Sequence, residues 1–120
     1  MKSNGLEILN SEENGYVMLT KCNGWRIGTV NYCSEIGGTP KKRERHLNTD
    51  EAFILSCGKA WLYIGEEMHK IQLFPGRVYN VKKNVWHSVI MEEDSKIFVI
   101  EDADTGDENT ERIYFGGEKL

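Results

Sequence analysis

The sequence predicts an all-β domain, and three features of the chain support this fold class. Short segments rich in apolar and β-branched residues recur at intervals of roughly 8–12 residues, which is typical of a closed barrel or a sandwich. Asn23-Gly24 and Pro75-Gly76 are strong turn signals between such segments. No segment shows the apolar periodicity of an amphipathic helix of about ten residues or more.

Each expected strand is bounded by residues that favour turns. In chain order, the expected strands are 16–22, 25–32, 43–46, 51–57, 60–64, 70–74, 77–81, 86–91, 96–100 and 111–115. The connections between them contain Gly, Asn, Asp or Pro, which adopt turn conformations readily. These turns do not recur at a fixed period, which excludes a repeat solenoid.

Length and composition indicate one globular domain covering residues 1–120. A chain of 120 residues fits a single domain, since domains cluster near roughly 100–150 residues. Apolar residues make up 39% and charged residues 28% of the chain, which is ordinary for a folded protein. No apolar run approaches the roughly 20 residues that span a bilayer, and the polar, acidic start lacks signal-peptide character. We therefore expect a cytoplasmic protein that does not bind membranes.

The charge balance opposes nucleic-acid binding. The chain has 15 basic and 19 acidic residues, a net charge of −4, whereas phosphate backbones require clustered Lys and Arg. The one basic run is 41–45, which Glu44 interrupts. It is either a solvated loop that leads into a strand or a guide for an anionic ligand toward a pocket mouth.

The cysteines predict neither a disulfide framework nor a zinc knuckle. Their number is odd and no pair has the CxxC spacing. We expect Cys22, Cys33 and Cys57 to be small buried hydrophobic residues in a reducing compartment.

The placement of the histidines is the most informative feature of the sequence. Because strand side chains alternate between faces, Glu44 and His46 lie on the same face, and Glu51 returns to that side after a four-residue turn. A histidine and a carboxylate that converge inside a barrel are costly unless they bind a metal, bind a ligand or satisfy one another. His87 lies in a distant strand, whereas His69 is expected to be an exposed loop residue.

Two spaced motifs resemble those of the cupin superfamily. The first cupin motif resembles Gly38-x5-Glu44-x-His46-x4-Glu51-x6-Gly58, and the second resembles Gly76-x5-Lys82-x-Asn84-x2-His87. The resemblance implies a small bacterial cupin with a double-stranded β-helix, that is, a jelly-roll barrel. The barrel core would span about 38–101, with an N-terminal hairpin at 15–35 and a C-terminal strand at 111–115. Glu44, His46, Glu51 and His87 would then point into one cavity.

The chain departs from the motifs at several positions. Glu44 stands where the family has its first His, Lys82 where it has Pro, Asn84 where it has Gly, and Met91 where it has Asn. Asn84 is a mild change, because Asn tolerates the left-handed turn.

Glu44 is the departure that bears on the metal. The implied ligand set becomes Glu44, His46, Glu51 and His87, which suits iron, manganese or zinc. In the alternative, Glu44 has removed the metal, and the other three side chains form a hydrogen-bonded cluster that touches a ligand directly. Tyr79 and Trp86 lie beside the second motif, where they line the pocket or, more often for such residues, pack in the core.

The resemblance leaves two functions open. One is a metal-dependent enzyme of the oxygenase, isomerase or lyase type acting on a small molecule, with Glu44 moving a proton. The other is a non-catalytic module that binds or senses a metabolite. We also expect a homodimer formed through the first hairpin and 111–115, since a small barrel exposes edge strands and aromatic surface.

Overall fold

The computed structural model describes residues 2–116, whose regular structure is almost entirely β-strand. The strands are β1 Lys2–Ser3, β2 Leu6–Glu7, β3 Gly15–Cys22, β4 Trp25–Asn31, β5 Lys42–His46, β6 Glu51–Cys57, β7 Ala60–Ile64, β8 His69–Gln72, β9 Tyr79–Val81, β10 His87–Met91, β11 Lys96–Glu101 and β12 Thr110–Tyr114. Two 3₁₀ turns, η1 Ser34–Ile36 and η2 Asp107–Asn109, interrupt the described chain. No helix in residues 2–116 is long and apolar enough to cross a membrane.

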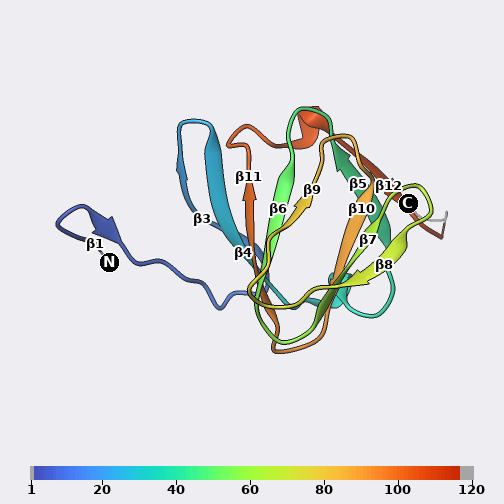
Figure 1. The fold of residues 1–120 in the computed structure, drawn as a ribbon, viewed down its shortest axis with the longest axis horizontal. Helices are drawn as coiled ribbons and strands as arrows, with labels where there is room; N and C mark the ends of the chain where they lie inside the picture. Colours follow the sequence, from blue (N-terminus) through green and yellow to red (C-terminus); the bar gives the residue numbers. More distant parts are fainter. Residues whose placement is uncertain (1, 117–120) are drawn as a thin grey trace.

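Within the described chain, two five-stranded antiparallel sheets face each other, and the chain winds between them (Figure 1). One sheet has the order β12-β5-β10-β7-β8 and the other the order β3-β4-β11-β6-β9. From β5 onward the chain changes sheet at nearly every connection, which is the winding of a double-stranded β-helix. The predicted fold class, an all-β cupin-type barrel, is therefore confirmed.

The core fills the space between the sheets. It is formed by the inward side chains that strand alternation selects, namely Val30, Phe53, Leu55, Ala60, Leu62, Leu73, Val81, Met91, Ile97 and Val99. Three of these, Val30, Phe53 and Val99, also line a cavity at one end of the barrel. The apolar interior therefore leads directly into the wall of that cavity.

Most strand boundaries agree with the sequence prediction, and the differences have local causes. β6 and β7 have the predicted bounds, and Asn23-Gly24 closes the β3–β4 hairpin. The strand predicted at 77–81 is shorter, because it begins only at Tyr79 after the Pro75-Gly76 turn. His69 is exposed as expected, but it opens β8 opposite Ile64 and does not lie in a loop.

The short β1–β2 hairpin was not predicted, and it extends away from the barrel (Figure 1). The segment that follows it is held to the barrel by two buried polar side chains. Lys96 Nζ donates to Asn10 Oδ1 at 2.6 Å, and Asn31 Nδ2 donates to the carbonyls of Ser11 and Glu13 at 2.9 Å. The hairpin therefore leaves the barrel from a fixed point.

The expectation that the cysteines are buried was wrong. Cys22 and Cys57 are exposed and Cys33 is half-buried, and all three are free thiols. Cys22 and Cys57 each end a strand immediately before a turn, where side chains meet solvent.

Candidate functional site

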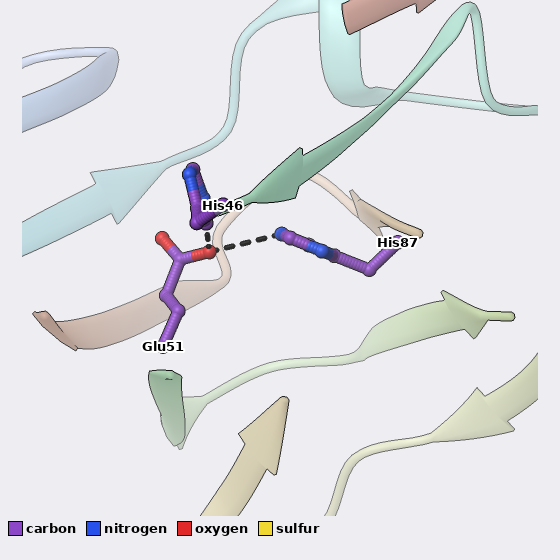
Figure 2. A group of neighbouring side chains, drawn as sticks. All are labelled: His46, Glu51 and His87. Atoms are coloured by element: carbon purple, nitrogen blue, oxygen red, sulfur yellow. Dashed lines mark hydrogen bonds and ion pairs between the residues drawn. The ribbon is translucent and has the colours of Figure 1, made fainter. Parts of the chain in front are cut away.

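The side chains of His46, Glu51 and His87 converge on one another from three strands (Figure 2). His46 is the last residue of β5 and Glu51 the first residue of β6, so the short connection between them carries the chain from one sheet to the other. His87 is the first residue of β10 and pairs with Glu44 of β5. Sheet pairing therefore brings His87 beside two residues that precede it by more than 30 positions.

One carboxylate oxygen contacts both imidazoles. Glu51 Oε1 lies 3.0 Å from His46 Nε2 and 2.9 Å from His87 Nε2. Both histidines are buried, with exposed fractions of 7% and 5%. One ligand atom from each of the three residues lies within 4.8 Å of the others, so the group could hold a metal ion.

The outer nitrogens of the histidines fit a metal site. His87 Nδ1 lies 3.0 Å from the carbonyl oxygen of Val85, which only accepts, so Nδ1 carries the proton. His46 Nδ1 lies 2.9 Å from Thr110 Oγ1. Nε2 of His87 then contacts Glu51 Oε1 in one of two ways: it carries a second proton and donates it, or, in the neutral ring, its lone pair and the carboxylate bind one metal ion. Orienting Nδ1 contacts of this kind are typical of metal-binding histidines.

The electrostatics of the group favour an ionised Glu51. Burial raises the pKa of Glu51, but hydrogen bonds from His46 and His87 outweigh it and hold that pKa well below the ordinary value. Burial lowers the pKa of His46, and its hydrogen bond to Glu51 raises that pKa overall. The carboxylate therefore stays charged and available as an anionic ligand.

Glu44 lines the same cavity but has different partners. Arg112 Nε donates to Glu44 Oε2, and Lys42 Nζ donates to the same oxygen at 3.1 Å. Burial raises the pKa of Glu44, and these two cations lower it overall. Among the described residues, the group of mutually close ligand atoms contains His46, Glu51 and His87 without Glu44.

The cavity that these side chains share has a volume of about 440 Å³. Pockets for small molecules usually measure roughly 300–1,000 Å³. Its wall combines apolar residues of the core with ionisable residues from both sheets. The cavity can therefore enclose a small polar molecule beside the His–Glu–His group.

Comparisons with known proteins agree on the fold. No family model and no curated protein matches this chain. A cupin-2 domain protein from Shewanella frigidimarina matches with a TM-score of 0.60 at 23% identity, covering 78% of this chain and 84% of that one. KdgF from Halomonas matches with a TM-score of 0.62 at 16% identity, covering 85% and 91%. Streptomyces Pac13 with uridine matches with a TM-score of 0.66 at 9% identity, covering 88% and 83%.

The chain has the cupin fold. At these identities the likeness concerns the arrangement of strands, and it matches the winding described above.

Two aromatic residues beside the second motif do not line the cavity of this cupin barrel. Tyr79 Oη accepts a hydrogen bond from the amide of Phe74. Trp86 is buried beneath the guanidinium groups of Arg43 and Arg45, which lie 4.5 and 4.6 Å from its ring centre. Because Glu44 and His46 face the cavity, strand alternation turns Arg43 and Arg45 toward Trp86 on the other face.

Sequence reasoning missed Glu101, which is buried beside Glu51. The two residues are paired across β11 and β6, and Arg26 donates to Glu101 Oε2 from Nε at 3.0 Å and from Nη2 at 2.7 Å. Burial, together with the charge of Glu51, raises the pKa of Glu101 to about 7. The sequence does contain a pattern that predicts burial of Glu101. Ile97, Val99 and Glu101 alternate along one strand and therefore share its inward face.

The raised pKa of Glu101 predicts a pH-dependent stability in metal-free protein. The folded-state pKa of about 7 lies above the usual 4.5, so the folded state binds more protons between these values. Stability must then fall as pH rises from about 4.5 to 7, by up to about 3 kcal/mol. We expect Glu101→Gln to reduce this loss, measured as the free energy of unfolding of chelator-treated protein at pH 5 and pH 8. An identical pH dependence in both proteins would contradict the prediction.

Proposed function

We propose that this chain is a metal-dependent enzyme acting on a small polar molecule, with the metal held by His46, Glu51 and His87. The observation that carries the proposal is the convergence of two imidazole nitrogens and one carboxylate oxygen in a buried group. Two histidines and one carboxylate suit iron, manganese or zinc. When bound, such an ion would polarise an oxygen atom of the substrate.

Among the oxygenase, isomerase and lyase reactions, a neighbour with the same fold favours the lyase type. Pac13 is described as a nucleoside dehydratase, and it matches this chain with a TM-score of 0.62 at 7% identity, covering 88% of this chain and 83% of that one. A barrel of this size can therefore house the elimination of water from a small polar molecule. The likeness supports a reaction type, and it does not extend to the substrate.

Within this proposal, Glu44 moves the proton. Its carboxylate faces the cavity two residues from His46, so it reaches a substrate that contacts the His–Glu–His group. Glu101 lies beside Glu51 across β11 and β6, and its pKa of about 7 also suits proton transfer near neutral pH. Activity of Glu44→Gln and Glu101→Gln variants would separate the two roles once a substrate is known.

Elemental analysis of protein purified without a metal-affinity tag tests the proposal. We expect about one equivalent of iron, manganese or zinc per chain. The alternative, a non-catalytic module that binds or senses a metabolite, is favoured by one observation: Glu51 Oε1 can accept a hydrogen bond from Nε2–H of each histidine, which satisfies the group without a metal. Protein that stays metal-free after incubation with each of these ions would contradict the metal proposal and favour that alternative.

The proposal includes a homodimer. β3 and β12 are edge strands of the two sheets, and both carry exposed apolar side chains, such as Tyr16 and Met18 on β3 and Ile113 and Tyr114 on β12. Burying such edges against a second copy would protect unpaired backbone groups. We expect a dimer by light scattering at high micromolar concentration, and a monomer there would contradict this part of the proposal.

A cytoplasmic location also belongs to the proposal. Cys22 and Cys57 are free and exposed. Exposed free thiols are stable where glutathione and thioredoxin keep them reduced, as in the cytoplasm.

A further inference from the structure

The cavity wall beside the His–Glu–His group is built from two paired strands, β5 and β12. Their register places Thr110 opposite His46 and Arg112 opposite Glu44. Both of these pairs face the cavity, and each is joined by a hydrogen bond. β12 therefore sets the position of two cavity side chains of β5.

The charges in this wall are unequal. Lys42 and Arg112 both donate to one oxygen of Glu44, so two cations share one carboxylate. Asp107 lies 3.6 Å from Arg112, but its side chain is 91% exposed, and such surface pairs contribute little. Lys41 also lines the cavity, and its partners are backbone carbonyls, which leave its charge in place. On the β5–β12 part of the wall, two cations therefore share one carboxylate, while Glu35, Glu51 and Glu101 lie elsewhere in the lining of the cavity.

We propose that Lys42 and Arg112 bind an anionic group, a carboxylate or a phosphate, of the ligand that enters the cavity. Glu44 occupies this position when no ligand is present and yields it on binding. The planar guanidinium of Arg112 matches the oxygen pair of a carboxylate or a phosphate. This inference deepens the proposed function and rests on it for the use of the cavity.

The spacing of β5 places this anion site within reach of the His–Glu–His group. Glu44 and His46 are two residues apart on the same face, which corresponds to about 6.6 Å along a strand. A ligand whose anionic group lies between Lys42 and Arg112 therefore presents its next few atoms to His46. The ligand is accordingly a small acid or phosphate ester with its reacting atom near the charged group.

Two other arginine–carboxyl pairs lack such a second cation. Arg26 donates two hydrogen bonds to Glu101, which makes one cation for one carboxyl group. Arg45 pairs with Glu111 on the opposite face of the same two strands, outside the cavity. The Arg45–Glu111 pair is therefore a matched control for Arg112–Glu44.

The test is a nuclear magnetic resonance titration of the arginine Nε–H signals in chelator-treated protein. The probes are acetate, its neutral isostere acetamide, and inorganic phosphate. We expect acetate or phosphate to shift the Arg112 signal, whereas acetamide should not. The anion that binds more tightly indicates whether the ligand carries a carboxylate or a phosphate. Lys42→Gln should weaken anion binding about tenfold, read from the Arg112 signal, because a charge-assisted hydrogen bond is lost.

Two further variants sharpen the test. Glu44→Gln should tighten anion binding about tenfold, since it removes the internal competitor, and Arg45→Gln should leave it unchanged. The proposal is overturned if the wild-type Arg112 signal does not respond to either anion, if acetamide binds equally well, or if Lys42→Gln binds anions as the wild type does. The wild-type titration decides the matter even where Lys42→Gln does not fold. The titration uses metal-free protein, so failure to bind anions would not count against the proposed metal site. Conversely, failure to bind metal in the elemental analysis would not count against the anion site.

Discussion

Replacing His87 by alanine is expected to abolish the metal binding that we propose. Its Nε2 is one of three converging ligand atoms, and it lies 2.9 Å from Glu51 Oε1. The loss should exceed the roughly 10–100-fold fall in affinity typical of removing a residue that only orients a ligand. The measurement is metal content by elemental analysis after dialysis against metal-free buffer.

His69→Ala is the matched control, because that histidine is exposed on β8 and is expected to leave metal content unchanged. Equal metal content in His87→Ala and wild type would place the site elsewhere. Glu44→His adds a second arm, since it restores the imidazole that the first cupin motif carries. If the wild type is metal-free and the Glu44→His variant contains metal, the glutamate at position 44 is what prevents metal binding. That pair of results would favour the binding module.

Gly58→Ala is expected to cause the largest loss of stability. Gly58 has a φ of +85°, and an added Cβ would lie 2.1 Å from the Ser95 hydroxyl oxygen and 2.6 Å from Ser95 Cα. Ser95 cannot move away easily, because its hydroxyl accepts from the amide of Lys59 and donates to the Lys59 carbonyl. We expect a loss of about 3–5 kcal/mol in the free energy of unfolding, from the left-handed conformation and the clash together.

Gly65→Ala separates these two contributions. Its φ is +87°, almost the same as that of Gly58, but no atom lies within 4 Å of an added Cβ. Its free energy of unfolding should therefore fall by only about 1–2 kcal/mol, the cost of placing alanine in the left-handed backbone conformation. Urea unfolding of both variants measures the difference, and equal losses would show that the segment around Ser95 accommodates the extra methyl group.

The features that the sequence by itself determined are local ones. Strand alternation and turn residues set the bounds of β6 and β7 and closed the Asn23-Gly24 hairpin. Asn84 adopts a φ of +69°, the left-handed conformation that Asn tolerates in place of the glycine of the motif. The approach of His46 to Glu51 is also local, since five positions and one turn separate them. Each of these follows from the conformational preferences of a few consecutive residues.

The tertiary structure alone decided the remaining contacts of the site. His87 reaches Glu51 only because β10 pairs with β5. Glu101 lies beside Glu51 because β11 pairs with β6, and Arg112 meets Glu44 because β12 pairs with β5. Pairing between distant strands depends on the register of the whole barrel, and shifting it by one residue would turn every side chain to the other face. That is why the ligand group could be anticipated in outline from its motifs, while the buried carboxyl of Glu101 and the two cations that share Glu44 could not.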